Sequence, residues 1–516
     1  MPQFTTSRTT TADFTTYDGT RLSYRTHGTG EPLVVLPGGP MRDADYLEDL
    51  GGLSAHRTLI VPDQRGVGGS ATPADPASYR CDRQVADVEA LRAHLGLERI
   101  DLLGHSAGGN LAVLYAAAHP GRLRSLVLVT PGTRAVGIEI SDEEWDSAVE
   151  VFAGEPWYPE ARAALEGIGP DTPLEEQSEI VMPFAYGRWD AAARAHAAAA
   201  ATEMNWTAAR AFYAPGAFEP EATRTALRAL TAPVLVLAGE YDAGPSPVRA
   251  AELAACFPHA ELVVQPRAGH FPWVDDAGDF VRPVLAFLDP EVRTVVVDGV
   301  RLAYRVSGPE EAPPVVLVHG RGGDGTDWAG IAAELSADRR VYAVDLRGHG
   351  LSDRPGHYGF GVFRDELGGF LKALGLTGAT VVAHSMGGAA AYLLAQREPG
   401  LIGRLVLEDA PVFFPLDPPR GPAGPPEEPA SFDWAVLDAT NAELDDPDPA
   451  WRTELSAITV PTLVLGGGES SHLPQEQLAW MTEQLPDARH VTIDTGHLIH
   501  ESRPREFLAA LREFGV

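Results

Sequence analysis

The stretch LLGHSAGG, residues 102–109, constrains the fold of this chain more than any other part of the sequence. It continues an apolar run, IDLL, and leads into the helical pattern GGNLAVLYAAAH. We therefore expect a strand, a sharp turn at Ser106 and a helix, with Gly104 and Gly108 as the small neighbours that such a turn needs. The turn presents the Ser106 hydroxyl at a helix N-terminus, where backbone N–H groups favour developing negative charge. Ser106 is therefore a candidate nucleophile.

The same pattern occurs a second time as VAHSMGG, residues 382–388, with Ser385 as a second candidate nucleophile and Ala383 in place of the first glycine. Two further pairs of segments match: DGTRLSYRTHG with DGVRLAYRVSG, and VPDQRGVGGS with AVDLRGHGLS. In each pair the second copy lies about 280 residues after the first, and a shared offset over separated motifs indicates a duplicated domain.

Each half alternates short apolar runs with helical patterns, which is typical of βαβ units around a mostly parallel sheet. The expected strands are PLVVL, TLIV, IDLL, SLVLV, PVLVL and ELVVQ in the first half, and PVVLV, VYAV, TVVA, RLVLE, PTLVL and HVTI in the second. The halves join at LDPEVR, residues 288–293. We predict an α/β protein of two tandem domains, residues 1–290 and 291–516, each a mostly parallel sheet flanked by helices.

The composition excludes several classes of partner. The 516 residues include 72 acidic and 40 basic side chains, a net charge of −32, which disfavours nucleic acid and anionic membrane surfaces. Cys81 and Cys256 form neither a disulfide framework nor a zinc-ligand spacing, and the sequence has no phosphate-binding loop, so we expect no metal and no organic cofactor. The polar N-terminus has no signal-peptide pattern and no apolar run has the length of a membrane span, so we expect a cytoplasmic protein.

A serine nucleophile needs a base, and the base needs an acid that orients it. In the first half, Asp242 follows the expected strand PVLVL and His270 follows the next one, ELVVQ. Side chains that follow neighbouring parallel strands meet at one edge of the sheet. Ser106, Asp242 and His270 are therefore the candidate catalytic residues of the first half.

With these residues in that chain order, both halves resemble α/β-hydrolase-fold enzymes over nearly their whole length. PGGPM (37–41) and DQRGVGGS (63–70) in the first half resemble the proline iminopeptidases, although Pro37 and Met41 depart from the His-Gly-Gly-Pro-Gly loop of those enzymes. The resemblance implies an oxyanion hole formed by the Gly39 and Ala107 N–H groups.

The second half resembles esterases and lactonases of the same fold. The motifs are VHGRGG, DLRGHGLS, AHSMGG and TGHLIHESRP. By this resemblance, His497 is the base that serves Ser385, and the Arg321 and Met386 N–H groups form the oxyanion hole.

The acid of the second half is displaced. Aligning PVLVLAGEYD with PTLVLGGGES puts Ser470 opposite Asp242, with Glu469 one residue earlier. At the end of the preceding strand, Asp409 replaces Thr130 of the first half. We favour Asp409 as the acid and keep Glu469 as the alternative. A third interpretation, in which Asp409 is a helix cap and the second site is inactive, stays open.

The interval between SLVLV and PVLVL in the first half is longer than that between RLVLE and PTLVL in the second. In this fold that interval, which follows the sixth strand of the complete sheet, forms the lid. We expect a long helical lid over about residues 133–230 and a shorter lid over about 412–457, whose segment DPPRGPAGPPEEPA is too rich in proline and glycine for a helix. In proline iminopeptidases, lid carboxylates hold the free amino group of the substrate. That resemblance implies such a role for Glu203, against the alternative of an exposed helical glutamate.

The sequence as a whole favours a tandem serine hydrolase that transfers acyl groups to water from a small-molecule or short-peptide substrate. Amide or peptide bonds in the first half and ester or lactone bonds in the second are the expected division. Two alternatives remain: one working hydrolase fused to a degenerate binding or scaffolding copy, and a thioesterase or cyclase that acts on a biosynthetic intermediate.

Overall fold

The computed structural model describes residues 9–169, 171–415, 418–424 and 431–516. The chain divides into two compact units, Met1–Leu288 and Asp289–Val516, here called the first and second domains. The division falls two residues before the boundary expected from the sequence. Each domain is an eight-stranded sheet with helices on both faces, so the predicted fold class is confirmed.

The two sheets have the same order of strands. The first runs β1 (Thr10–Thr15), β2 (Arg21–His27), β4 (Thr58–Pro62), β3 (Pro32–Leu36), β5 (Ile100–His105), β6 (Leu123–Val129), β7 (Val234–Gly239) and β8 (Ala260–Gln265). The second, taken in the same direction, runs β9 (Val292–Val297), β10 (Val300–Ser307), β12 (Arg340–Val344), β11 (Pro314–Val318), β13 (Ala379–His384), β14 (Ile402–Glu408), β15 (Thr462–Gly466) and β16 (Ala488–Thr492). Only the first three strands of each order pair antiparallel, and all the expected strands are present.

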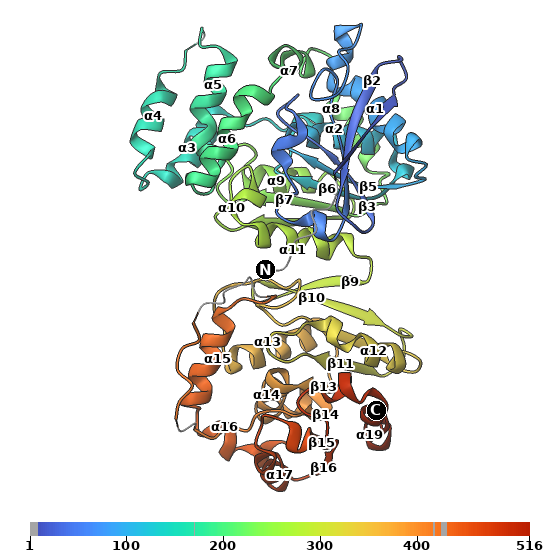
Figure 1. Ribbon diagram of the computed structural model, residues 1–516, viewed down its shortest axis with the longest axis vertical. Coiled ribbons are helices and arrows are strands. Elements are labelled where there is room, and N and C mark those ends of the chain that lie inside the picture. Colours follow the sequence, from blue (N-terminus) through green and yellow to red (C-terminus); the bar gives the residue numbers. More distant parts are fainter. Residues whose placement is uncertain (1–8, 170, 416–417, 425–430) are drawn as a thin grey trace. The chain divides into compact units, whose positions relative to one another are not determined.

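The central strands are continuous apolar runs because both of their faces are buried. On β3, Val34 and Leu36 pack into one core of the first domain, whereas Leu33 and Val35 pack into another on the opposite face. Helices cover both faces (Figure 1). In the first domain they are α1 (Cys81–His94), α2 (Ala107–Ala118), α9 (Pro247–Ala254), α10 (Pro272–Asp275) and α11 (Ala277–Leu288). In the second they are α12 (Ala329–Leu335), α13 (Phe360–Ala373), α14 (Ser385–Arg397), α17 (Gln475–Gln484), α18 (Ile499–Ser502) and α19 (Pro504–Phe514).

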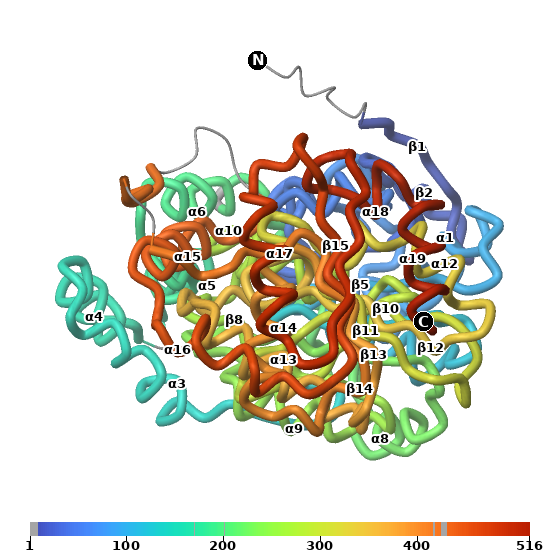
Figure 2. The backbone as a smooth tube through the Cα atoms, turned by 90° about the horizontal axis from the view of Figure 1, so that it is seen from below, coloured from blue at the N-terminus to red at the C-terminus, as the bar shows by residue number. Residues whose placement is uncertain are grey.

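The lids lie in the predicted intervals, between β6 and β7 and between β14 and β15. The first contains α3 (Asp142–Val149), α4 (Tyr158–Glu166), α5 (Leu174–Val181), α6 (Ala191–Glu203), α7 (Trp206–Phe212) and α8 (Pro220–Leu227). Figures 1 and 2 show α3 to α6 grouped at one side of the first domain. The second lid contains α15 (Ala435–Asp445) and α16 (Ala450–Thr453). Of the proline-rich segment 417–430, residues 418–424 are not helical, and residues 417 and 425–430 lie outside the described residues.

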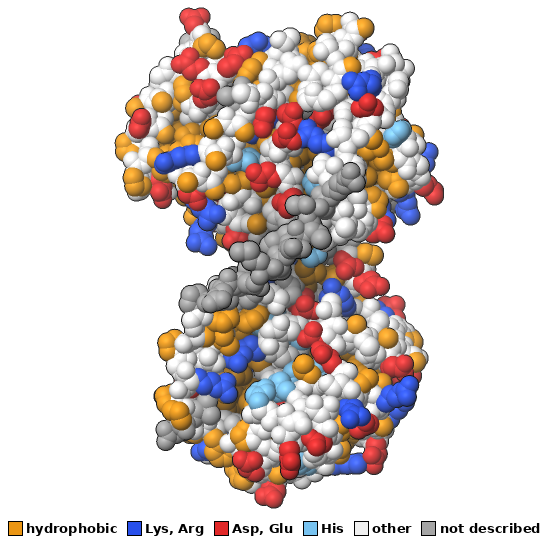
Figure 3. Space-filling model, viewed as in Figure 1, with side chains coloured by type: hydrophobic (Ala, Val, Ile, Leu, Met, Phe, Trp, Pro, Cys, Tyr) orange, Lys and Arg blue, Asp and Glu red, His pale blue; other side chains and the backbone are white. Residues whose placement is uncertain are grey.

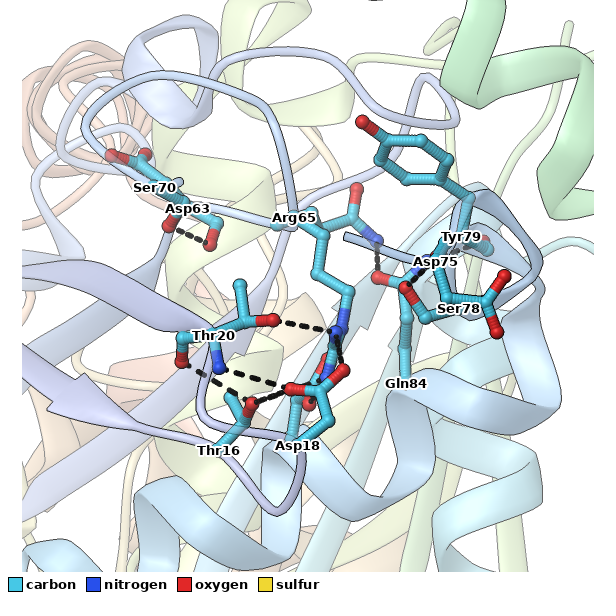
Figure 4. Close-up of polar contacts among 12 residues, drawn as sticks. Thr16, Asp18, Thr20, Asp63, Arg65, Ser70, Asp75, Ser78, Tyr79 and Gln84 are labelled. Atoms are coloured by element: carbon cyan, nitrogen blue, oxygen red, sulfur yellow. Dashed lines mark hydrogen bonds and ion pairs between the residues drawn. The ribbon is translucent and has the colours of Figure 1, made fainter. Parts of the chain in front are cut away.

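A buried arginine braces the loop after β4, as Figure 4 shows. The Arg65 side chain is fully buried, and its guanidinium lies 2.5 Å from carboxylate oxygens of Asp18 and Asp87. It also donates to the hydroxyls of Thr16 and Thr20 at 3.2 Å. Two carboxylates and two hydroxyls therefore compensate the burial of this charge.

A serine closes the same loop in both domains. The Ser70 hydroxyl donates to the Asp63 carbonyl at 2.7 Å, and the Ser352 hydroxyl donates to the Asp345 carbonyl at 2.6 Å. Contacts within the D-Q-R-G and D-L-R-G loops thus stabilise the same turn in both domains. Among the described helices, none has the length and apolar character needed to cross a membrane.

Candidate active sites

Ser106 occupies the turn that the sequence predicts, between β5 and α2. Its φ is 52°, a conformation that costs energy for a residue with a side chain and that raises its hydroxyl above the sheet. Gly108 makes the turn possible, because a Cβ at this position would lie 2.4 Å from the Leu36 carbonyl oxygen. Ser385 repeats the geometry with φ 50°, and a Cβ on Gly387 would lie 2.4 Å from the His319 carbonyl.

In the first domain, the loops after β7 and β8 bring an acid and a base to Ser106. His270 Nε2 lies 2.8 Å from Ser106 Oγ, and His270 Nδ1 lies 2.9 Å from Asp242 Oδ2. Asp242 is buried, and its other carboxylate oxygen accepts the Gly244 N–H at 2.9 Å. The structure thus joins the three residues singled out in the first half into one hydrogen-bonded chain.

The second domain forms the same chain with its acid on a different strand. His497 Nε2 lies 2.9 Å from Ser385 Oγ, and His497 Nδ1 lies 2.6 Å from Asp409 Oδ2. Asp409 is fully buried at the end of β14, whereas Glu469 is exposed and makes no such contact among the described residues. Between the two acids considered from the sequence, the geometry selects Asp409.

Asp409 is held by more than its histidine. Its carboxylate accepts hydrogen bonds from the Ser471 hydroxyl at 2.5 Å, the Gln475 amide at 3.0 Å and the Gly467 N–H at 3.1 Å. Burial raises the pKa of this carboxyl, but the hydrogen bonds from His497, Ser471, Gln475 and Gly467 outweigh it, so the Asp409 pKa lies below its ordinary value. Sequence reasoning missed Ser471, in the loop after β15, and Gln475, at the start of α17, because single polar residues at such positions carry no periodic signal.

The expected oxyanion donors belong to two segments in each domain, a helix N-terminus and a loop after a strand. The Ala107 and Met386 N–H groups lie in the first turn of α2 and α14, where no preceding turn accepts from them. The loops after β3 and β11 supply Gly39 and Arg321. The glycines just before these two residues, Gly38 and Gly320, pack so closely that a Cβ would lie 2.8 Å from the Ser106 Cβ or 3.2 Å from the Ser385 Cβ.

A buried histidine precedes each serine and contacts the carbonyl of the candidate base. His105 Nε2 donates to the His270 carbonyl at 3.0 Å, and His384 Nε2 donates to the His497 carbonyl at 3.0 Å. Burial lowers the pKa of His105 well below its ordinary value and that of His384 to about 4, so both rings are neutral near pH 7.

In the first domain this contact extends into a longer network. Tyr46 donates to His105 Nδ1 at 2.7 Å and accepts the Gly38 N–H at 2.6 Å. Tyr46 and His105 therefore connect the loop of the oxyanion donor Gly39 to the loop of His270. The sequence gives no sign of this link, since it joins residues that are distant along the chain.

Two cavities meet at the first site. The first, of about 560 Å³, is lined mainly by apolar side chains of the lid, and the second, of about 600 Å³, has a more polar lining. Ser106, His270, Arg134 and Tyr213 line both cavities. A carbonyl group bound at Ser106 would therefore have space on either side.

The structure corrects the expectation for Glu203. Its side chain is 16% exposed and its carboxylate lies 2.8 Å from Arg42 Nε, so it is neither an exposed helical residue nor free to hold an amino group. The residues that line the first cavity include Arg42 and do not include Glu203. An internal ion pair thus occupies the carboxylate that the iminopeptidase resemblance assigned to the substrate.

Basic and aromatic groups surround the second site. The Arg321 side chain donates to Thr440 and Asn441 of α15, at 3.1 and 3.0 Å. The His472 ring lies 4.2 Å from that of His497 between centroids. Figure 3 shows histidine side chains gathered in a hollow on one face of this domain. In neither domain do the described residues contain a group of three or more His, Cys, Asp or Glu side chains placed to hold a metal ion.

Comparisons with known proteins agree with the fold. A family model described as alpha/beta hydrolase fold matches residues 31–277 and, a second time, residues 313–434. An uncharacterized Mycobacterium tuberculosis protein is 36% identical over 131 residues, which are 25% of this chain and 38% of that protein. A proline iminopeptidase of Lactobacillus helveticus is 44% identical over 101 residues, 19% of this chain and 34% of the enzyme. The chain thus spans well under half the length of these two relatives.

Longer but weaker matches also exist. An sn-1-specific diacylglycerol lipase of Mus musculus is 26% identical over 259 residues, 41% of this chain and 84% of that protein. Among solved structures, Est816, titled as an N-acyl homoserine lactone degrading enzyme, is 26% identical with a TM-score of 0.38, and the match covers 43% of this chain and all of that one.

Proposed function

Because the chain belongs to the α/β hydrolase fold family, we propose that both of its domains are serine hydrolases that cleave ester, lactone or amide bonds through an acyl-serine intermediate. The observation that carries the proposal is the hydrogen-bonded chain of serine, histidine and aspartate, present twice, with every link between 2.6 and 2.9 Å. In each domain the serine of this hydrogen-bonded series lies on a strained turn at a helix N-terminus, the arrangement needed for nucleophilic catalysis.

The first half-reaction acylates the serine. Ser106 or Ser385 Oγ attacks the carbonyl carbon of the substrate while the Nε2 atom of His270 or His497 takes the hydroxyl proton. The buried aspartate accepts a hydrogen bond from Nδ1–H, which keeps Nε2 unprotonated and stabilises the imidazolium that forms. The N–H groups of the two oxyanion loops and helix termini bind the negative charge on the carbonyl oxygen.

Acylation is complete when the tetrahedral intermediate collapses, the bond to the alcohol or amine breaks and that leaving group takes the proton from histidine Nε2. The second half-reaction releases the acid. Water then loses a proton to the same nitrogen as it attacks the acyl-serine, and the serine oxygen recovers that proton as the carboxylic acid departs.

The sequence motifs divide the two substrate classes between the domains. PGGPM and DQRGVGGS, together with the similarity to a proline iminopeptidase, favour amides or short peptides for the first domain, and the motifs of the second half favour esters or lactones for the second. The free thiols of Cys81 and Cys256 are compatible with a reducing, cytoplasmic setting. A thioesterase or cyclase reaction would use the same acyl-serine and differ only in the acceptor that attacks it.

A fluorophosphonate probe tests the proposal directly, because it reacts with an activated serine whatever the natural substrate. We would count adducts by intact mass in the native chain and in the Ser106→Ala and Ser385→Ala variants. Two adducts, each lost with its own serine, are expected. One adduct, lost only in Ser106→Ala, would mean that the second domain is a degenerate copy. No adduct in any form would overturn the proposal.

A further inference from the structure

Arg134 occupies a special position at the first site. It begins the short helix η5 (Arg134–Val136) at the start of the lid and lines both cavities that contain Ser106 and His270. A substrate whose carbonyl carbon lies at Ser106 would extend into one or both of these spaces. Any such substrate passes close to the Arg134 guanidinium.

The Arg134 guanidinium is held in position but not neutralised. Its central carbon lies 4.6 Å from the centroid of the Tyr213 ring, a cation–π contact that restrains the side chain. Among the described residues no carboxylate forms an ion pair with it. Four other lid arginines do pair with carboxylates: Arg162, Arg188, Arg210 and Arg224. In a chain with many more acids than bases, an arginine at the site without an acidic partner is a distinctive feature.

Asp242 is engaged by His270 and the Gly244 N–H, and the other charges near Ser106 do not compensate Arg134. The Arg42 charge is paired with Glu203, and the first cavity has no acidic residue in its lining. The second cavity contains one, Glu139, which is exposed and forms no ion pair with Arg134 among the described residues. The site therefore carries an available positive charge and lacks a free carboxylate for a substrate amino group.

The lining of the first cavity indicates a second property of the substrate. Its lid side includes Ile168, Leu174, Val181, Met182, Met204 and Trp206. Burial of an apolar chain or ring against this surface is favourable in proportion to the area that is removed from water. An apolar moiety is therefore the group that best fits this space.

We propose that Ser106 hydrolyses acyl compounds that combine an apolar moiety, bound in the first cavity, with a carboxylate or other anionic group bound by Arg134. The proposal rests on the proposed hydrolase function and specifies its substrate class in the first domain. It replaces the free-amino peptide expected from the iminopeptidase resemblance. Arginine suits the role because its planar guanidinium donates two parallel hydrogen bonds to a carboxylate.

The test uses two matched pairs of fluorophosphonates. In one pair the phosphorus carries a C6 alkyl chain that ends in a carboxylate or in its methyl ester. In the other pair the carboxylate or methyl ester ends the alkoxy group, so the anion enters the opposite cavity. The rate of Ser106 labelling is followed by intact mass in a Ser385→Ala background, which removes the second serine.

We expect the anionic member of at least one pair to label Ser106 about twofold to fivefold faster than its ester, because Arg134 is exposed and solvent screens part of its attraction for the anion. The Arg134→Gln variant should lose this preference while the neutral probes still label Ser106, which shows that the site remains folded. Arg210→Gln is the matched control, a lid arginine that pairs with Glu175, and it should retain the preference.

The outcomes separate the two proposals. Equal labelling by both members of both pairs, faster labelling by the esters, or a preference that persists in Arg134→Gln would each overturn the role of Arg134. All three leave the hydrolase function standing, because Ser106 still reacts. If none of the four probes labels Ser106, the hydrolase proposal fails for this domain, and the substrate class fails with it.

Discussion

The two domains differ most informatively at the residue that follows their sixth strands. Thr130 follows β6 with φ 39° and Asp409 follows β14 with φ 42°. The two residues thus have nearly the same φ and differ in their side chains. The Thr130 hydroxyl donates to the His270 carbonyl at 2.9 Å, whereas the Asp409 carboxylate contacts the ring of His497. One domain therefore uses this position to hold the histidine backbone, and the other uses it to orient the histidine ring.

This exchange is possible because the histidine lies over the ends of two adjacent parallel strands. In the first domain an acid after β7 reaches the ring, and in the second an acid after β14 reaches it from the neighbouring strand. The segment after β15 has no acid at the aligned position and instead donates to Asp409 through Gly467 and Ser471 of the loop and Gln475, the first residue of α17. An acid after either of two adjacent parallel strands can thus reach the histidine ring, and the contacts of the neighbouring loop differ accordingly.

The largest effects are expected when the acid of each domain is replaced by its neutral amide. Asp242→Asn should abolish most Ser106-dependent hydrolysis and Asp409→Asn most Ser385-dependent hydrolysis, each with a loss of about 10⁴-fold in kcat, because an amide stabilises the wrong histidine tautomer. Each variant is measured in a background with the other serine replaced by alanine. Glu469→Gln is the matched control and should keep full activity. A large loss in Glu469→Gln would return the acid role to that residue.

A second experiment moves the acid of the first domain to the position used by the second. Adding Thr130→Asp to Asp242→Asn should recover activity by roughly tenfold to a hundredfold over Asp242→Asn alone, as expected for strongly coupled sites. Aspartate tolerates the positive φ of this position better than most residues. Recovery should be incomplete, because the first domain has no counterpart to the hydrogen bond from Ser471. No recovery at all would mean that the acid position depends on its loop rather than on the sheet edge.

The third prediction concerns the network of Tyr46, His105 and Gly38, which has no counterpart among the described residues of the second domain. Tyr46→Phe leaves the Gly38 N–H and His105 Nδ1 without their partner, so we expect kcat at Ser106 to fall roughly tenfold through misplacement of the oxyanion and histidine loops. KM and the labelling of Ser385 should be unchanged. A rise in KM with constant kcat would indicate that Tyr46 acts on substrate binding and not on positioning.

Much of this arrangement follows from local sequence patterns. Apolar runs, the glycines around Ser106 and the ends of strands are encoded by adjacent residues, so the strands, the serine turns and the histidines are predictable, and the family model confirms the resemblance that they carry. The contacts that were missed join distant segments. Glu203 and Arg42 form an ion pair across 161 positions of sequence, and no local pattern predicts this pairing. Arg134 and Tyr213 likewise come together only through the folded lid.

The smallest expected effect is on stability, and it concerns the charge of the buried Asp409 in the second domain. Because the Asp409 pKa is below its ordinary value, this carboxylate stabilises the fold above the pKa of an unfolded aspartate, about 3.9, and loses that contribution as the pH falls through its folded pKa. Ser471→Ala removes one of the hydrogen bonds that lower the pKa. It should therefore reduce the stability of the second domain by about 1–2 kcal/mol at pH 7 and by less at an acid pH below the folded pKa of Asp409. Hydrogen exchange of peptides from β14 and α14 measures this domain alone, and Ser470→Ala, an exposed neighbour, is the control. A loss of equal size at both pH values would mean that Ser471 supports the loop and does not act on the charge of Asp409.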